Sequence, residues 1–463
     1  MPLLTMAAVI AALIIFIVLG LRARRSAGLD DYLTARRSQT GTTLGLSFLA
    51  SGMGAWILFA PPEVGAFVGP VAVAGYALGS ALPFIILGLL GPAIRRRLPT
   101  GRSLTEFTAS RFGRGFRYWV AALSVLYMLC FLAAELTAIG AITSLLSGVD
   151  GRLVTVAVAV ATLLYTAIGG LRASLITDRW QAWLLIALIG LVSYGALGLA
   201  PAASAPSVGA LPSPGLGSGL AVALTLIIAV TAANLFHQGY WQRVWAARDD
   251  QSLRRGAVLG GVTTIIMVAV LGGAGVLAAA RGLDLGTPPI PFFALLADAP
   301  GWLTLPALIL AITLVASSVD TLQNALVSLG VTESGRLGLG GARWLSALLM
   351  MPVVALALQE ISVLRLFLIA DLLCATAVIP LLSGLSDRVP PRAAIAGALA
   401  GMVGAVVPGI IAGGSIGAGL LAASFPGAVP TLGPFLGALL ASGAVTLLVA
   451  RLAPLSRPGS VPG

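Results

Sequence analysis

Several oxygen-bearing side chains lie close together within a long apolar stretch, in the sequence LVASSVDTLQNAL. They are Ser317, Ser318, Asp320 and Thr321. Hydroxyl, carboxylate and carbonyl oxygens are the ligands that hard cations prefer, and sodium is such a cation. The stretch therefore indicates a cation site. Serines in membrane helices also commonly donate to the carbonyl four residues earlier, and this second interpretation stays open.

A second stretch, LASGMGAWILFAPPEVGAF over residues 49–67, combines apolar residues with glycines, two adjacent prolines and a glutamate. Proline donates no N–H and clashes with the carbonyl four residues before it, so backbone groups are freed from the helix. Such groups are tolerated at membrane depth only where they line a cavity or are buried in protein. The stretch predicts either a helix broken at a binding site or a structural proline kink that binds nothing.

Ionisable residues inside apolar stretches are further candidates, because a charge at mid-membrane is costly and usually functional. They are Glu63, Glu135, Asp320, Arg365 and Asp371. Arg365 and Asp371 lie near Glu360 in the sequence. The three residues are predicted either to form a structural ion-pair group or to contact the substrate or a gate. Glu135 is predicted either to bond neighbouring helices or to bind an ion or a proton.

The composition identifies the elements that must position these residues. Hydrophobic residues make up 58% of the 463, charged residues only 9%, and mean hydropathy is +1.03, whereas soluble domains carry about 25% charged residues. The chain is predicted to be an all-α polytopic membrane protein of about thirteen spans, each near the ~20 residues that cross a bilayer. The predicted spans are 3–21, 42–66, 70–94, 118–147, 153–169, 180–200, 219–241, 256–280, 302–330, 344–358, 361–385, 393–413 and 431–450.

All 27 basic residues are arginine, and they set the predicted topology. With the N-terminus outside and the C-terminus cytoplasmic, all except Arg152, Arg281 and Arg365 fall in inner segments, as the positive-inside rule requires. The net charge of +11 is thereby explained by topology. We therefore predict a multi-pass protein of the plasma (bacterial inner) membrane, with lipid contact and no nucleic-acid partner.

No soluble domain fits, so residues 1–463 are predicted to form a single transmembrane domain. Ser103 and Glu106 have capping-box spacing and predict a short surface helix, whereas the Gly/Pro-rich stretches 200–219 and 412–433 predict flexible external loops. One histidine and two cysteines within predicted spans provide no metal cluster and no nucleophile and base pair. The protein is therefore not predicted to be an enzyme.

Four stretches, in this order, resemble motifs of the sodium:solute symporter family. They are LDDYLTARRSQTGTTLGLSFLASGMGAW, AIGGLRASLITDRWQ, HQGYWQRVWAARDDQSLRRG and ASSVDTLQ, and the similarity runs from Asp30 to Arg392. The resemblance implies the LeuT-type fold, with two inverted five-helix repeats at 42–200 and 219–385. Residues 3–21 would then form an extra N-terminal span, and 393–450 two C-terminal spans.

The resemblance also implies a sodium site between the broken first core helix and the eighth. Carried over by position, its ligands would be the backbone carbonyls of Ala50, Met53 and Leu314 and the hydroxyls of Ser317 and Ser318. Asp178 matches a family aspartate implicated in sodium release, although a simple helix-end charge is the alternative. Gly52 stands where proline-type members have an aspartate, which leaves the solute undetermined.

These observations together predict a symporter that uses sodium as the coupling ion to import a small polar organic solute. The predicted solute or gate residues are Trp56, Glu63, Glu135, Asn234 and His237. His237 stands where the family often has Asp or Asn, and a plain interfacial role is equally open. The alternatives are proton coupling through Glu135 or Asp320, and a transporter-like membrane sensor that acts through a separate partner. Oligomeric state and stoichiometry are not predicted.

Overall fold

The computed structural model describes residues 33–52, 54, 56–198, 216–285, 289–296, 299–359, 363–426 and 430–452, with scattered helical positions between 7 and 18. Most of the predicted N-terminal span 3–21 and of the predicted loop 200–219 lies outside these residues. In the described part, nine helices are long and apolar enough to cross a membrane, and two shorter apolar helices accompany them. The protein is an integral multi-pass membrane protein, and the number of about thirteen spans stays a prediction.

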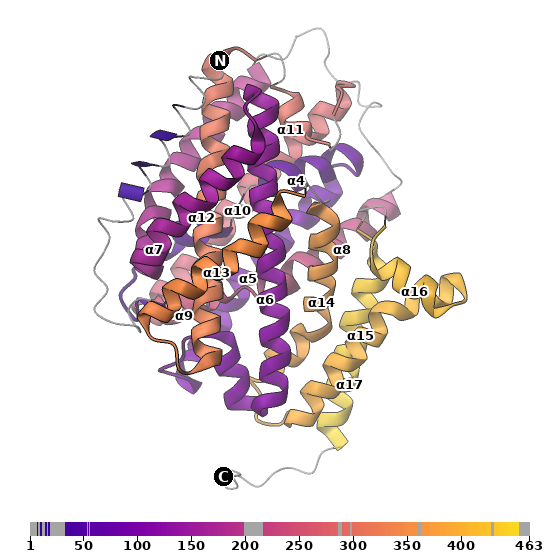
Figure 1. The fold of residues 1–463 in the computed structure, drawn as a ribbon. Helices are drawn as coiled ribbons and strands as arrows, with labels where there is room; N and C mark the ends of the chain where they lie inside the picture. The colour runs from indigo at the N-terminus through magenta and orange to yellow at the C-terminus, as the bar shows by residue number, and fades with distance from the viewer. Residues whose placement is uncertain are drawn as a thin grey trace.

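The helices form one elongated bundle with a smaller C-terminal group beside it (Figure 1). The bundle begins with α3 (Gly41–Gly52), α4 (Trp56–Phe67), α5 (Pro70–Arg97), α6 (Leu104–Ser147) and α7 (Gly151–Gly198). It continues with α8 (Leu216–Asn234), α9 (Gln238–Ala246), α10 (Asp250–Ala280), α11 (Pro291–Ala294), α12 (Gly301–Ser334), α13 (Leu339–Ala357) and α14 (Val363–Ser383). The C-terminal group consists of α15 (Pro391–Gly413), α16 (Ile416–Ala423) and α17 (Leu432–Leu452).

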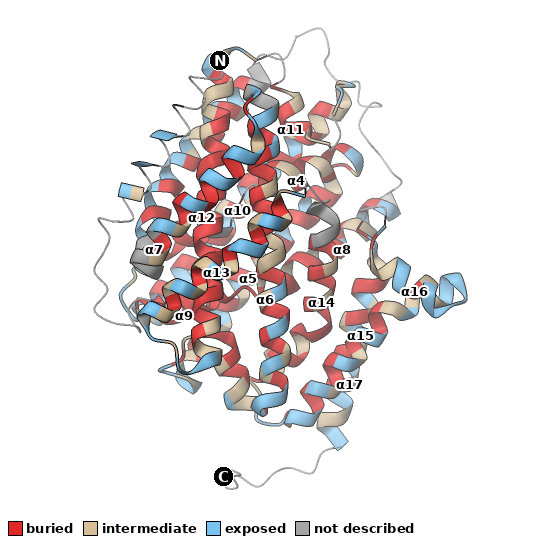
Figure 2. Ribbon diagram, in the orientation of Figure 1, coloured by how far each residue is buried: buried red, intermediate tan, exposed pale blue. Residues whose placement is uncertain are grey.

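Helix α12 lies at the centre of the bundle. It packs against α6, α7, α3 and α13, and 72% of its most apolar stretch is buried, compared with 33% for α17. Figure 2 shows this difference as a buried interior and a paler outer surface. Many exposed large apolar side chains lie on the outer helices, as a lipid-facing surface requires. The serines and Asp320 of α12 therefore lie in the protein interior and not against lipid.

The predicted span 42–66 is interrupted, with α3 ending at Gly52 and α4 beginning at Trp56. Pro61 and Pro62 lie beyond the break, buried inside α4. The helix is therefore interrupted after Gly52, with Gly54 outside both helices, and not at the prolines.

A second interruption divides the predicted span 219–241 into α8 and α9, so the prediction of one continuous span there was wrong. The ring of His237 explains the break, because its Nδ1 accepts a hydrogen bond of 3.0 Å from the N–H of Gly239 and caps α9. The indole of Trp241 donates to the Leu235 carbonyl over 2.8 Å and satisfies a second backbone group there. An interrupted helix now begins each predicted repeat, while the inverted repeats themselves stay a prediction.

A helix is present where Ser103 predicted one, as the first part of α6, but it does not lie on the surface, because Leu104, Thr105, Phe107 and Thr108 are buried. Ser103 Oγ accepts from the N–H of Glu106 over 3.0 Å, and the Glu106 carboxylate accepts from the N–H of Arg102 over 2.6 Å. Gly113 then adopts φ 75°, which separates this part from the membrane span that follows. Ser103 and Glu106 thus begin the helix as their spacing indicates.

Two other boundaries differ from the predictions. The stretch 412–433 contains the helix α16, because Ser415 Oγ accepts from the N–H of Ala418 over 3.1 Å and begins a helix where a flexible loop was predicted. The two predicted spans 153–169 and 180–200 belong to a single helical element, α7. No proline lies between these two spans to end the helix there.

Candidate ion and solute site

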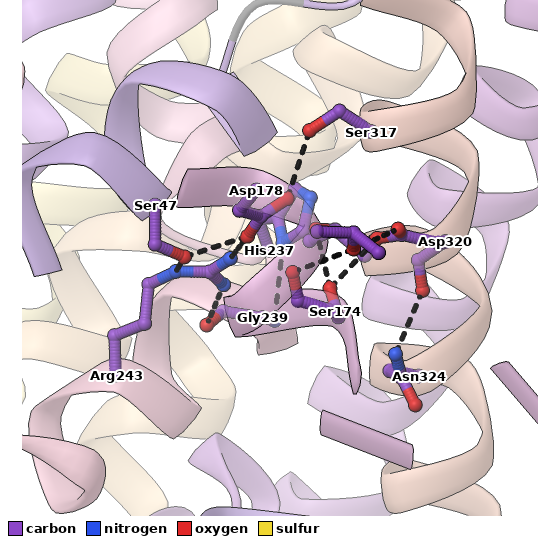
Figure 3. Close-up of polar contacts among 11 residues, drawn as sticks. Ser47, Ser174, Asp178, His237, Gly239, Arg243, Ser317, Asp320 and Asn324 are labelled. Atoms are coloured by element: carbon purple, nitrogen blue, oxygen red, sulfur yellow. Dashed lines mark hydrogen bonds and ion pairs between the residues drawn. The ribbon is translucent and has the colours of Figure 1, made fainter. Parts of the chain in front are cut away.

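A fully buried ion pair lies between α7 and α9. Arg243 Nη2 is 3.1 Å from Asp178 Oδ2, and neither side chain is exposed. The Ser47 hydroxyl of α3 donates to the same carboxylate oxygen over 2.7 Å and accepts from Arg243 Nε over 3.0 Å. Arg243 Nη1 donates to the Gly239 carbonyl over 2.8 Å. The guanidinium therefore contacts oxygen atoms of three different helices, α3, α7 and α9 (Figure 3).

Asp178 also joins this cluster to α12. Ser317 Oγ donates to Asp178 Oδ1 over 2.8 Å, on the side of the carboxylate away from Arg243 (Figure 3). Ser317 thus bonds to another helix and not to the carbonyl four residues earlier. Ser318 is buried on the same helix. One carboxylate therefore connects α3, α7, α9 and α12.

The cluster lies beside the end of α3. Ser47 is about one turn before Ala50, and the carbonyls of the last turn of a helix have no intrahelical donor. The end at Gly52 therefore leaves the Ala50 carbonyl among the oxygens available to a cation, which the negative end of the helix dipole also favours. Leu314 is buried on α12 one turn before Ser317 and Ser318. Met53 lies outside the described residues.

A second carboxylate lies further along the interface between α7 and α12. Asp320 accepts from Ser174 Oγ over 2.7 Å and from Thr177 Oγ1 over 3.3 Å. Its backbone carbonyl accepts from the Asn324 amide over 3.0 Å. Asp320 thus faces α7, next to Asp178, and these bonds hold the two helices together in the interior.

The carboxylate of Glu135 lies against the break between α3 and α4. Glu135 is buried on α6, and a Cβ atom placed on Gly54 would collide with the Glu135 carboxylate oxygens. Glycine at 54 is therefore required for this close approach. The structure brings Glu135 to the interrupted segment that separates the two predicted sites.

A small cavity of about 30 Å³ lies beyond the break. It is lined by Trp56, Val64, Tyr76, Phe131, Leu226, Val230, Asn234, Phe367, Leu368, Asp371 and Pro430. Of the predicted solute or gate residues, Trp56 and Asn234 line this cavity, whereas Glu63, Glu135 and His237 do not. The Asn234 amide oxygen accepts from the Tyr127 hydroxyl over 3.1 Å.

The remaining predicted gate residues have other surroundings. Glu63 is partly buried on α4. His237 caps α9, and its ring stacks on Tyr240 at 4.4 Å between centroids and 8° between planes. The predicted group of Glu360, Arg365 and Asp371 is described only for Asp371, since the other two side chains lie outside the described part.

Sequence reasoning missed two members of the buried cluster. Arg243 was assigned to an inner segment as a topology-setting arginine, but it is fully buried because Asp178 neutralises its charge. Ser47 was not singled out at all. The apolar neighbours Trp241 and Trp245 were the available signal, because a surface arginine has no need of two tryptophans within two residues of it.

Comparison with known proteins identifies the family. The model of the sodium:solute symporter family matches residues 32–324. "Spermidine transporter DUR31" of Candida albicans is 32% identical over 368 residues, covering 77% of this chain and 70% of the relative. The chain belongs to the sodium:solute symporter family. "Sodium/glucose cotransporter 4" of Danio rerio is 26% identical over 276 residues, which is 52% of this chain and 40% of that protein.

Solved structures agree on the fold of this family member. A Na⁺-coupled sialic acid symporter in a substrate-bound outward-open state aligns with a TM-score of 0.71 at 14% identity, over 96% of this chain and 98% of that one. Inward-facing Mhp1 aligns with a TM-score of 0.60 at 16% identity, over 94% and 96%. The LeuT-type fold that the resemblance implied is therefore confirmed, and the family and relatives are transporters rather than enzymes.

Proposed function

We propose that this protein is a sodium-coupled symporter that imports a small polar organic solute across the plasma membrane. The observation that carries the proposal is the hydrogen-bonded connection from Ser317 of α12, through Asp178, to Ser47 of α3. It holds the hydroxyls of α12 beside the end of a broken helix. In the proposed site, sodium binds the carbonyls of Ala50, Met53 and Leu314 and the hydroxyls of Ser317 and Ser318.

The proposed coupling uses the contact between α3 and α12. A sodium ion that binds both helices favours the arrangement in which they are close together, and a solute that binds the same arrangement more tightly is thereby favoured too. Linkage requires that the solute strengthen sodium binding by the same factor. Asp178 has the proposed role of accepting sodium on release, in competition with the guanidinium of Arg243.

The solute is proposed to bind beyond the break, where Trp56 and Asn234 line the cavity. Glu63, Glu135 and His237 are proposed as further solute or gate residues. The relative in Candida albicans is named as a spermidine transporter, so polyamines belong among the solutes to be tested here. The proposed orientation has the N-terminus outside and the C-terminus in the cytoplasm.

A direct test measures equilibrium binding of ²²Na⁺ to the purified protein and to the Ser317→Ala/Ser318→Ala variant. The variant is expected to lose sodium binding, because both side-chain ligands are removed. The matched control is Ser442→Ala on α17, a serine whose hydroxyl donates within its own helix, to the Leu439 carbonyl. Unchanged sodium binding in the double variant would contradict the proposed site.

Uptake into proteoliposomes then tests the coupling ion. Labelled spermidine, urea, proline and glucose are offered with an imposed sodium gradient, a proton gradient or neither. We expect uptake of at least one solute to require sodium and to survive a protonophore. Uptake that ignores sodium and stops with the protonophore would replace sodium coupling with proton coupling. Binding of a solute without any uptake would support a sensor instead.

A further inference from the structure

The carboxyl group of Asp371 is buried in the wall of the cavity, and its Oδ1 has no partner among the described residues. Asp371 lies on α14, is 6% exposed and lines the cavity. Its Oδ1 accepts no hydrogen bond from the described residues. A buried polar group without a partner destabilises a protein, and native structures contain few such groups. An unpartnered carboxyl at the solute cavity therefore points to a ligand that supplies the missing partner.

Four aromatic rings surround the same cavity. Trp56 of α4 stacks on Tyr76 of α5 with 5.5 Å between centroids and 17° between planes. Phe131 of α6 contacts Phe367 of α14 with 4.2 Å between centroids. The faces of aromatic rings carry negative potential and attract organic cations, most strongly where water is excluded. The rings and the carboxyl group thus favour the same sign of charge on a ligand.

The remaining lining residues exclude the obvious alternatives. Among the described residues that line the cavity, none is basic, so none of them matches an anionic solute. A bare metal cation requires several oxygen ligands, but most of this lining is aromatic or aliphatic. The volume of about 30 Å³ holds a group of about the size of one water molecule. An ammonium head group has this size, and the rest of a longer solute would require the rings to move.

We propose that this cavity binds the ammonium group of an organic amine, with Asp371 as its counter-ion and Trp56, Tyr76, Phe131 and Phe367 as its aromatic wall. The proposal rests on the proposed function, because it names the solute class of the same symporter. Asp371 is the specificity-determining residue in this assignment. The rings contribute to affinity but do not distinguish an amine from other cations of the same size.

The test measures binding of spermidine and of methylammonium to the purified protein by isothermal titration calorimetry, in sodium and in potassium buffer. Asp371→Asn is expected to weaken spermidine binding by about 30-fold or more, because a buried charged partner is lost. Asp371→Glu keeps the charge and should recover part of the affinity. The matched control Asp150→Asn removes an exposed carboxylate whose contact with the Arg152 N–H an asparagine can replace, and it should change nothing.

Sodium binding separates a specific effect from misfolding. Asp371→Asn should bind ²²Na⁺ as the wild type does, since Asp371 is not a proposed sodium ligand. If the variant does not fold, Phe131→Leu takes its place, and it should weaken methylammonium binding several-fold without affecting sodium binding. The proposal would be overturned if a folded Asp371→Asn protein bound spermidine as tightly as the wild type does. It would also be overturned if Phe131→Leu and the wild type bound methylammonium equally tightly.

The proposal and the proposed function fail in different ways. If the protein takes up urea, proline or glucose with sodium and binds neither amine, the symporter proposal stands and the amine site is wrong. If Asp371 determines amine binding but uptake is independent of sodium, the amine site stands and sodium coupling is wrong.

Discussion

Replacing Arg243 with glutamine should be among the most destabilising single changes that keep a polar side chain. The guanidinium is completely buried, is paired with Asp178, and donates to Ser47 and to the Gly239 carbonyl. Glutamine is shorter and uncharged, so Asp178 would keep its negative charge in the interior with hydroxyl donors in place of a cation. Breaking a buried pair in this way typically costs about 3–5 kcal/mol, because the remaining charge is uncompensated.

The distance between the two charges gives an interaction energy comparable with this destabilisation. Two unit charges 3.1 Å apart interact by about 5 kcal/mol at an effective dielectric constant of about 20. Removing both charges, with Asp178→Asn and Arg243→Gln together, should cost less than Arg243→Gln alone, because no unpaired charge is left. The coupling energy in a double-mutant cycle should therefore be large and favourable.

Unfolding by sodium dodecyl sulfate titration in mixed micelles supplies the free energies for the wild type, the two single variants and the double variant. The matched control is the cycle for Arg117 and Glu333, whose side chains are 3.0 Å apart but 23% and 20% exposed. A partly exposed pair contributes about 0–1 kcal/mol. If the Arg243 cycle gives no larger a coupling energy than the Arg117 cycle, the buried pair does not stabilise the fold as argued.

Two further predictions concern packing and pH. Gly275→Ala should lower the unfolding midpoint, because a Cβ there would collide with the Pro62 carbonyl. The control is Gly273→Ala on the same helix, where a Cβ meets no atom and the midpoint should not change. Equal midpoints for the two variants would contradict the close packing of α4 on α10. The N–H and hydroxyl of Ser252 and the guanidinium of Arg248 lower the pKa of Asp249 from 3.8 to about 2. Because the folded-state pKa is depressed, this contribution to stability is present above pH ~4 and disappears as the pH falls through ~2. Asp249→Ala should therefore lower the unfolding midpoint at neutral pH, and the difference from wild type should disappear at acid pH; a constant difference would refute the assignment.

The sequence predicted the membrane class and most helix positions because apolar runs of sufficient length are visible without tertiary context. It also predicted the interruption of 42–66, where glycines weaken the helix. The interruption at Leu235–His237 was not predicted, because that stretch carries neither proline nor glycine before Gly239. The break there depends on the His237 ring capping the next helix, and such a cap is a matter of geometry that composition does not reveal.

In the candidate site, too, the features that depend on local sequence could be predicted and those that depend on tertiary packing could not. Ser317 and Ser318 were identifiable because two hydroxyls followed by an aspartate are unusual in an apolar run. Their partners were not, since Asp178 lies 139 positions away from Ser317 and Arg243 lies 65 positions from Asp178. Only the packing of α12 against both α7 and α9 brings these residues together. Asp371 was noted as an ionisable residue, but its aromatic surroundings come from α4, α5 and α6.

The two proposed sites share a short segment of backbone. Ala50, a proposed sodium ligand, lies near the end of α3, and the aromatic wall of the amine site begins at Trp56, the first residue of α4. Only residues 53–55 separate the two helices, and the Glu135 carboxylate lies against Gly54 within this segment. An ion that binds at the end of α3 therefore lies only a few residues along the chain from Trp56. In the proposed mechanism, the short segment between α3 and α4 is the connection through which sodium binding and amine binding affect each other.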